Sequence, residues 1–465
     1  MKKRFMALLP YGICLLFFIT YSILAVIRHL HFGSFGFDLG IVDQIVWKYS
    51  QFQAPITTIQ FYPFTSLLSD HVELIYVFLA PFYWIYSSPM TLLLLQTFVI
   101  TSSGLVVHFL SKKYKVHTVL ALSLLISYLT FYGIQNAIWF DVHSNVFGSA
   151  FLAWFIYFLA TGRKKMAILA FVLTIICKED MALLTLIVSG VFYLTTRKIM
   201  PLVFVIASLL YLGLIFFIYF PYFTQDGYRY ANPNGLISDI QFSYLYDSSE
   251  KWDVYFYSFG WFLFLPFLSP IFLLPFLGDI IHYFVLGNSI SGAQGLFMHY
   301  RASLAILLVW PFLMTVTKFQ RLNSFVVGVL LLIVVSLLQY QLHVPLTYLS
   351  KAWFWQEPAS VKDIRAVISY LPQDASVVAQ NNIVPHIAQR NEIFTLWPEK
   401  KNGRPTFRWA GNPQYLVVDT AVTWDTRHLL TDRETFLKGI ENLEKDKVIV
   451  KQRQQGSVIL YTLRN

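Results

Sequence analysis

A succession of long apolar segments, separated by short basic clusters, constrains this chain more than any other feature of its sequence. Of its 465 residues, 56% are hydrophobic and 13% are charged, whereas an average soluble domain carries roughly 25% charged residues. So few charges predict a lipid bilayer around the chain instead of a large aqueous core. We therefore expect an all-α polytopic membrane protein with about eleven transmembrane helices. The predicted spans are 7–27, 90–110, 116–134, 146–160, 164–177, 181–196, 199–220, 252–267, 269–285, 302–317 and 322–343.

The basic clusters set the expected orientation, because cytoplasmic loops carry an excess of Lys and Arg. The clusters are Lys2-Lys3-Arg4, Lys112-Lys113-Lys115, Arg163-Lys164-Lys165, Arg197-Lys198 and Lys318 with Arg321. If all of these clusters lie on the cytoplasmic side of a cell membrane, the N-terminus is cytoplasmic and the C-terminal region is extracytoplasmic. The net charge of +10 then reflects membrane topology, and we expect no nucleic-acid partner.

Some segments need a separate interpretation. Several predicted spans are shorter than the ~20 residues of a perpendicular helix, so broken helices or polar ends at the interface make up the difference. Residues 7–27 are long enough to span and carry no small-residue cleavage site, so they are expected to remain as the first helix. The orientation rule leaves the stretch 74–88 in the outer interface. Cys14 and Cys177 lie in apolar runs and indicate no disulfide framework.

The composition changes near residue 350, which predicts two domains. Residues 1–349 would form the membrane domain, with a first outer loop at 28–89, and residues 350–465 a small extracytoplasmic α/β domain. In this tail, 361–372 is typical of an amphipathic helix, and 375–380 and 414–420 of buried strands, before a terminal hairpin. The tail has no Gly-rich phosphate loop, metal cluster or nucleophile elbow. His386 and Arg390 are expected on a helix, where they are either ordinary surface residues or face the membrane site.

The acidic residues fall on one side of this topology, although only the basic residues were used to build it. Asp279 is the exception, within a proposed span. The outer acids are Asp38, Asp43, Asp70, Glu73, Asp141, Glu179, Asp180, Asp226, Asp239, Asp247, Glu250 and Asp253. Acids contribute little to orientation, so either the long charged loops are simply outside or an active site faces outward.

Candidate residues in the first half of the chain lie in two outer loops. Asp38 and Asp43 are five residues apart and would diverge by ~140° on one helix, so they are no paired-carboxylate motif. Asp70 and His71 follow Ser69 in a pattern typical of a helix cap. Asp141 and His143 occupy a very short loop, where charges near lipid need a function or a partner. Asp-x-His supplies only half of the ligands that a metal site needs. The sequence therefore leaves open whether the protein uses a divalent metal or no cofactor.

The most informative charges are Lys178, Glu179 and Asp180, a triplet with apolar residues on both sides. Charged residues at this membrane depth indicate a functional site. The alternative is that the lysine and its neighbouring acids only neutralise each other. His299 and Arg301 precede a span, where an arginine either acts or extends to the interface. Asp279 and His282 are three apart and are expected to hydrogen-bond each other.

These motifs, in this order, resemble the GT-C glycosyltransferases. The stretches FDLGIVDQ (37–44) and CKED (177–180) resemble, within them, a family of bacterial multi-spanning membrane proteins with FDLGxxDQ after the first helix. The resemblance covers roughly 7–343. It implies a catalytic aspartate at Asp38, a second acidic position at Asp141 and a donor-phosphate lysine at Lys178, where Glu179 replaces the usual glycine.

The expected function is inverting transfer of a sugar from a polyprenyl-phosphate-linked donor to an envelope glycan, lipid or protein. Asp38 would act as general base, and Lys178 with Arg301 would hold the departing phosphate. A transporter or flippase of lipid-linked sugars is a second hypothesis, and a non-catalytic envelope assembly protein is a third. A transporter would need charges near mid-span and internal repeats.

Overall fold

The computed structural model describes residues 2–59, 65–224, 241–286, 292–319, 322–421 and 426–464. Asp226, Asp239 and Arg321 lie outside these ranges. The chain forms two compact units that alternate along the sequence. The helical unit comprises Met1–Leu24, Ser69–Ile75 and Leu94–Ser350, and the mixed unit comprises Ala25–Leu68, Tyr76–Leu93 and Lys351–Asn465. The mixed unit thus combines the C-terminal region with most of the first outer loop.

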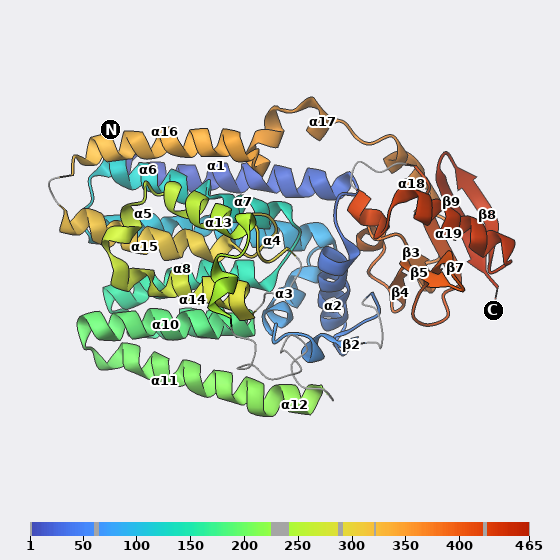
Figure 1. The fold of residues 1–465 in the computed structure, drawn as a ribbon, viewed down its shortest axis with the longest axis horizontal. Helices are drawn as coiled ribbons and strands as arrows, with labels where there is room; N and C mark the ends of the chain where they lie inside the picture. Colours follow the sequence, from blue (N-terminus) through green and yellow to red (C-terminus); the bar gives the residue numbers. More distant parts are fainter. Residues whose placement is uncertain are drawn as a thin grey trace. The chain divides into compact units, whose positions relative to one another are not determined.

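Helices make up the helical unit (Figure 1). In chain order they are α1 (Lys2–Leu30, continuing into the mixed unit), α4 (Pro89–Ser102, which begins in the mixed unit), α5 (Gly104–Lys113), α6 (Thr118–Leu129), α7 (Tyr132–Trp139), α8 (Ser144–Thr161), α9 (Lys164–Ile175), α10 (Glu179–Thr196), α11 (Ile199–Leu214), α12 (Phe220–Phe223), α13 (Ser249–Gly260), α14 (Leu274–Ile281), α15 (Ala302–Lys318) and α16 (Ser324–Leu342). Helix α10 packs against α8, α9, α11 and α14. The N-terminus of α10 is therefore surrounded by other parts of this unit.

Within the described residues, seven helical segments are long and apolar enough to cross a membrane. They are Met6–Leu30, Pro89–Lys113, Thr118–Trp139, Ser144–Thr161, Glu179–Thr196, Ile199–Phe223 and Ser324–Leu342. Shorter apolar helices cover Pro270–Leu286 and Ala302–Lys318. Helices α9 and α13 occupy two further predicted spans but have 12 residues each, fewer than the ~20 of a perpendicular crossing.

The outer faces of these helices are apolar, as contact with lipid requires. In the segment Ile199–Phe223, only 17% of the residues in the most apolar stretch are buried. The side chains of Leu210 and Phe217 in this segment are 69% and 82% exposed. A soluble protein rarely exposes so continuous an apolar surface. The polytopic membrane class predicted from composition is confirmed.

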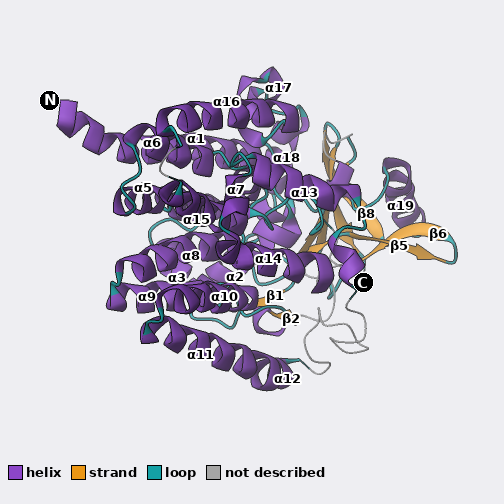
Figure 2. Cartoon of the chain, turned by 60° about the vertical axis from the view of Figure 1, so that its left-hand side comes forward, coloured by secondary structure: helices purple, strands orange, loops and turns teal. Residues whose placement is uncertain are grey.

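The strands belong to the mixed unit (Figure 2). Its main sheet has the order β4-β3-β7-β9-β8, formed by β3 (Val377–Ala379), β4 (Ile393–Thr395), β7 (Tyr415–Asp419), β8 (Ile449–Gln455) and β9 (Val458–Leu463). Strand β3 pairs in parallel with β4 and β7, whereas β9 is antiparallel to β7 and β8. The predicted buried strands, the terminal hairpin and the small α/β domain are confirmed.

Other elements of the mixed unit surround this sheet or precede it in the chain. They are the π-helical turn η1 (Gly36–Gly40), α2 (Ile41–Ser50), the short pair β1 (Ile56–Thr57) and β2 (Thr65–Ser66), α3 (Ile75–Tyr83, which begins in the helical unit), α17 (Ala352–Trp355), α18 (Ser360–Ile368), the hairpin β5 (Trp397–Lys401) and β6 (Arg404–Arg408), and α19 (Arg433–Lys445). The predicted helix at 361–372 is thus shorter than expected.

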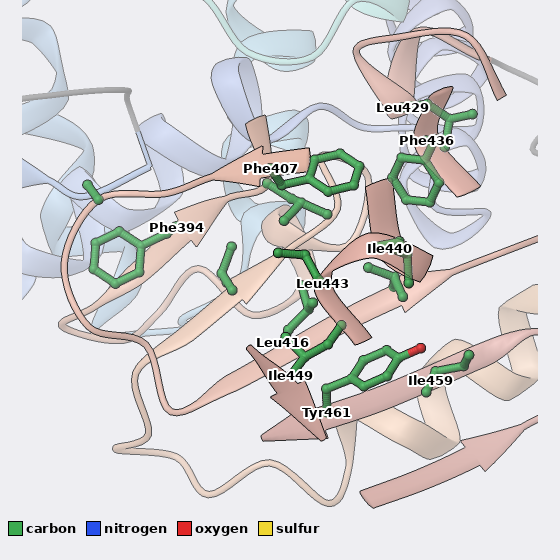
Figure 3. Packing of buried hydrophobic residues seen from close by; sticks show 14 residues of the cluster. Phe394, Phe407, Leu416, Leu429, Phe436, Ile440, Leu443, Ile449, Ile459 and Tyr461 are labelled. Carbon is green, nitrogen blue, oxygen red and sulfur yellow. The ribbon is translucent and has the colours of Figure 1, made fainter. Parts of the chain in front are cut away.

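One hydrophobic core holds α19 against the sheet and the hairpin (Figure 3). Phe436 and Ile440 of α19 meet Phe407 of β6 and Tyr461 of β9, all at most 5% exposed. Gly439 permits this contact, because a Cβ there would lie 2.5 Å from the Phe407 ring. Aromatic residues dominate such cores because each removes a large apolar area from water.

His386 and Arg390 differ from the expectation of surface residues on a helix. The His386 ring stacks between His29 and Phe32, with ring centroids 4.2 and 3.6 Å away. Arg390 is 8% exposed and donates from Nε to the Ile387 carbonyl and from Nη1 to the Ala375 carbonyl. His386 ends a short 3-10 turn and Arg390 follows it outside any helix, so both residues have packing roles.

Candidate functional site

The charged triplet lies at the N-terminus of α10. Lys178 is the N-cap residue with an extended backbone, and Glu179 and Asp180 occupy the first helical turn. Carboxylates are favourable there because the helix dipole places positive partial charge at this end. Both acids are nearly inaccessible, at 2% and 5% exposure, so each needs partners within the protein.

Each neighbouring carboxylate is bound by another group of the helical unit. Glu179 accepts from His71 Nδ1 at 2.7 Å and from the Val72 backbone N–H at 3.0 Å. Asp180 accepts from the Tyr283 hydroxyl at 3.0 Å, and His282 Nε2 lies 3.6 Å from the same oxygen. Nearby, Glu73 accepts a short hydrogen bond from Ser144. Each acid of the triplet therefore has its hydrogen-bond partners outside the triplet.

Lys178 differs from these acids. Among the described residues, its half-buried side chain makes no hydrogen bond and no ion pair within 4 Å. Burial lowers the pKa of the Lys178 ammonium, but the carboxylates of Asp180, Glu179 and Glu73 outweigh burial and hold that pKa above its usual value. Lys178 is thus a charged group whose three N–H donors have no partner in the described part of the chain.

The His71 imidazole compensates one of these acids. Burial and Lys178 lower the pKa of His71, yet its contact with Glu179 outweighs them and leaves the pKa raised. A protonated His71 offsets the charge of Glu179. Asp70 and His71 do not cap a helix as predicted: a 3-10 turn ends at Ser69, and α3 begins only at Ile75. His71 acts instead by reaching across to α10.

The predicted Asp141–His143 loop is held in one conformation by α4. Gln96 of α4 donates to the Asp141 carbonyl at 2.7 Å and accepts from the His143 backbone N–H at 2.8 Å. Asp141 is fully buried in the left-handed region, with φ +70°, which non-glycine residues adopt infrequently. The His143 ring stacks on His299 with centroids 3.5 Å apart. The structure thus brings the 141–143 loop and the 299–301 segment together.

His299 is an uncharged part of this cluster. Burial lowers the pKa of His299 well below its usual range, and His143 and Lys178 lower it further. Its ring also contacts Tyr300, with centroids 4.1 Å apart. His299 therefore supplies a stacking surface and not a positive charge.

Arg301 is fully buried and held by backbone carbonyls. It donates from Nε to the Gly295 carbonyl at 3.2 Å and from Nη2 to that of Ala293. Its guanidinium carbon lies 5.2 Å from the Tyr283 ring centroid and 5.0 Å from that of Phe284. Among described groups only Nη1 has no acceptor. These contacts fit an arginine that anchors residues 293–301 better than one exposed to a ligand.

Asp279 and His282 do not bond to each other, contrary to the prediction. Asp279 accepts from the Ser303 hydroxyl at 2.7 Å, while His282 faces Asp180. Both side chains prefer partners on neighbouring helices because α14 packs against α10 and α15.

Asp38 and Asp43 belong to the mixed unit. Asp38 lies half-buried in η1, whereas Asp43 in α2 is 1% exposed and accepts from Tyr83 at 2.5 Å and Gln389 at 3.0 Å. Burial raises the pKa of Asp43 to about 7, against the lowering effect of these hydrogen bonds. The FDLGIVDQ motif thus contains one enclosed acid and one accessible acid.

Much of this motif joins the first outer loop to the C-terminal region within the mixed unit. Phe37 stacks on Trp397 with centroids 4.7 Å apart. The Gln44 amide accepts from the Thr58 backbone N–H and donates to the Arg390 carbonyl, each at 3.0 Å. A Cβ on Gly40 would lie 3.1 Å from Val384 Cγ1. Packing within the mixed unit therefore explains most of the motif.

Sequence reasoning gave no role to Gln96, Ser144 and Tyr283, and it did not connect Glu73 or His282 with the α10 site. Their partners are distant in sequence, and single polar residues in apolar helices were the one available signal. Within the part of the chain that the structure describes, no group of three or more His, Cys, Asp or Glu side chains is arranged to hold a metal ion.

Comparison with known proteins agrees with the predicted fold. The crystal structure of ArnT from Cupriavidus metallidurans bound to undecaprenyl phosphate is similar at 13% sequence identity and a TM-score of 0.52, over 98% of this chain and 97% of that one. At this identity the likeness concerns the fold alone, and the predicted GT-C-like fold is confirmed. No curated protein matches the chain. A family model described as predicted membrane protein (DUF2079) matches residues 28–445, and the chain belongs to this family.

Proposed function

We propose that this protein is a membrane glycosyltransferase that transfers a sugar from a polyprenyl-phosphate-linked donor to an acceptor of the cell envelope. The observation that carries the proposal is the ammonium of Lys178, which makes no hydrogen bond with any described group while the carboxylates around it are bound by other groups. The GT-C-like fold supports it, and ArnT was solved with a lipid phosphate of the same class.

A cation in this setting favours an anionic ligand. An ammonium that loses water on partial burial needs replacement acceptors, and phosphate oxygens are strong ones. The lipid chain of a polyprenyl phosphate would remain in the bilayer while its head group reached the N-terminus of α10, which itself favours anions. Lys178 would bind the phosphate in the ground state and stabilise the charge that develops as it departs.

The acid that follows Lys178 is the main objection, because a carboxylate weakens the attraction for an anion. His71 answers it: the imidazole bonds Glu179 at 2.7 Å and its pKa is raised. Glu179 would then hold His71 and the 71–73 segment in place. Arg301, with most of its donors on carbonyls, would anchor the neighbouring segment and not clamp the phosphate.

The proposed reaction is an inverting displacement. The acceptor hydroxyl transfers its proton to the Asp38 carboxylate as its oxygen bonds to the anomeric carbon. The bond from that carbon to the phosphate oxygen breaks, and the phosphate leaves with the electron pair. General-base catalysis of this kind contributes typically ~10²–10⁴-fold. Asp141 is the second acidic residue that we assign to the reaction. Gln96 holds its strained backbone in place.

Replacing Lys178 tests the proposal. We expect Lys178→Ala to weaken binding of undecaprenyl phosphate to the purified protein by roughly tenfold or more, the effect of losing a charge-assisted contact. Lys178→Arg should restore only part, because guanidinium geometry differs from that of ammonium. Native mass spectrometry would measure binding, and release of polyprenyl phosphate from a labelled lipid-linked sugar would measure transfer.

Lys198→Ala is the matched control, because Lys198 is the N-cap residue of α11 but is exposed. It should bind lipid phosphate as the parent does. If Lys178→Ala kept full lipid-phosphate binding but lost thermal stability, Lys178 would be an ion-pair partner and the proposal would fail. Movement of an intact lipid-linked sugar across vesicles without its cleavage would favour the transporter hypothesis instead.

A further inference from the structure

The main sheet of the mixed unit has a topological switch point. Strand β3 comes first in the chain, β4 adds to one side of it and β7 to the other. Connections from the carboxyl ends of β3 and β7 therefore leave in opposite directions. In open α/β sheets, such a point creates a crevice outside the carboxyl ends of the strands, where ligands bind.

A pocket of about 270 Å³ lies at this place. Asn382 follows β3 and Ala421 follows β7, and both line the pocket. Ser457, which directly precedes β9, and Ser360, the first residue of α18, line it as well. All of these residues belong to the mixed unit. The pocket thus coincides with the crevice that the strand order predicts.

Several buried polar atoms at this edge make no hydrogen bond with any described group, which points to a ligand. Asn382 is 3% exposed, and its Oδ1 makes no hydrogen bond with any described group. Next to it, Gln380 Nε2 and Asp419 Oδ2 are also unsatisfied among the described residues, at 1% and 0% exposure. Leaving a buried polar group unpaired costs free energy, so this concentration at the edge of one sheet needs an explanation.

The lining defines the class of ligand. It offers hydroxyl and amide groups, the imidazoles of His31 and His428 and one carboxylate, Asp363, whereas no Lys or Arg lines the pocket among the described residues. A carboxylate without a Lys or Arg beside it disfavours phosphates and nucleotides. Phe32 adds an aromatic wall, fixed by stacking on His386 at 3.6 Å. Small-molecule pockets span ~300–1,000 Å³, so this one suits a ligand with a single ring.

We infer that this pocket binds one neutral sugar residue, through the Asn382 amide, the Asp363 carboxylate and the serine hydroxyls. The site is separate from the proposed donor-phosphate site at Lys178, and the inference does not rest on the proposed transfer reaction. It gives the C-terminal region a role in recognising glycan, whatever reaction the helical unit performs.

The test uses the full-length protein in a detergent without a sugar head group. Saturation-transfer NMR would be recorded with D-glucose, D-galactose, D-mannose and N-acetyl-D-glucosamine, and with AMP as an anionic comparison. We expect at least one sugar to bind and AMP to bind less. Asn382→Ala should weaken that binding by roughly three- to tenfold, as loss of one hydrogen bond does.

Asn412→Ala is the control within the same unit, because Asn412 is exposed and does not line the pocket. It should bind as the parent does, and so should Lys178→Ala, which separates this site from the proposed donor site. If Asn382→Ala unfolds, Asp363→Asn decides, since it removes the carboxylate with little change in shape. Absence of binding by all four sugars, stronger binding of AMP, or unchanged binding in the pocket variants would overturn the inference.

Discussion

Asp38 and Asp43 come from one motif, yet their surroundings give them different chemistry. Asp43 is enclosed and accepts two hydrogen bonds on Oδ1, while its Oδ2 has no partner among the described groups. Asp38 stays half-buried in a π-helical turn, and such turns occur frequently at functional sites. This difference in burial is why Asp38 is the acid proposed to act on a substrate, whereas Asp43 is enclosed by the packing of the mixed unit.

Asp38→Asn should reduce sugar transfer by roughly 10²-fold or more while the protein remains folded, because the amide cannot accept the acceptor's proton. Turnover of a lipid-linked sugar donor would be measured beside thermal unfolding in detergent. Undecaprenyl phosphate binding should be unchanged, since Asp38 acts on the acceptor. A variant with turnover within a factor of a few of the parent would remove Asp38 from the mechanism.

Asp43 should make stability depend on pH. Its pKa is about 7 in the folded protein, against an ordinary value of 3.8. Between these values the unfolded chain loses the proton while the folded chain keeps it, so the stabilisation is complete below pH ~4 and is lost as the pH rises to ~7. Thermal unfolding of the parent and Asp43→Asn from pH 4 to 8 checks this. The parent should lose stability relative to the variant over that range, and parallel curves would contradict the assignment.

At the scale of elements, the site depends on close contact between α7 and the start of α15. A Cβ on Gly133 of α7 would lie 2.2 Å from the Arg301 carbonyl oxygen, whereas one on Gly190 of α10 would meet nothing within 4 Å. The contact brings α7 against the segment that Arg301 anchors. The close packing of α7 against residue 301 therefore requires a glycine at position 133.

Gly133→Ala should destabilise the protein by ~1–3 kcal/mol or more, because backbone atoms must move to admit the methyl group. Gly190→Ala, at an open position within a helix, should be neutral or slightly stabilising, by up to ~1 kcal/mol. Thermal unfolding of both variants in the same detergent makes the comparison. Equal stability of the two would show that α7 does not pack against residue 301 this closely.

A second contact between structural elements joins η1 to the C-terminal region. The Gly36 backbone N–H donates to both the side-chain and the backbone oxygen of Asn381, each at 2.8 Å. A Cβ on Gly36 would lie 2.9 Å from the same side-chain oxygen. The turn that carries Asp38 is thus positioned by a segment that lies 345 residues away in the chain.

For the whole molecule, the basic clusters predict that the acidic loops and the C-terminal region share the extracytoplasmic side. Ser249→Cys and Ser369→Cys introduce thiols at exposed positions, and Thr118→Cys does so beside the Lys112–Lys115 cluster. A membrane-impermeant maleimide added to intact cells should label the first two and not the third. The parent, with Cys14 and Cys177 buried, provides the background. Labelling of Thr118→Cys alone would invert the topology.

The sequence by itself determined the membrane class, the small C-terminal α/β domain and the GT-C-like fold. Insertion into lipid depends on hydrophobicity summed over ~20 consecutive residues, and such sums can be read without knowing the fold. The terminal hairpin is equally local, since β8 and β9 are adjacent in the chain. The hairpin β5–β6 has a local signal too, Asn402-Gly403, which is typical of a two-residue turn.

Tertiary structure alone decided the partners of the charged and polar residues. His71 finds Glu179 108 residues away, Gln44 reaches the Arg390 carbonyl across 346, and Asp279 bonds Ser303 instead of the nearer His282. It also left Lys178 without a partner among the described residues and brought Asn382 and Ala421 to one pocket. Hydrogen bonds act over about 3 Å, so partner choice follows from which elements pack together, and no local pattern of residues encodes that packing.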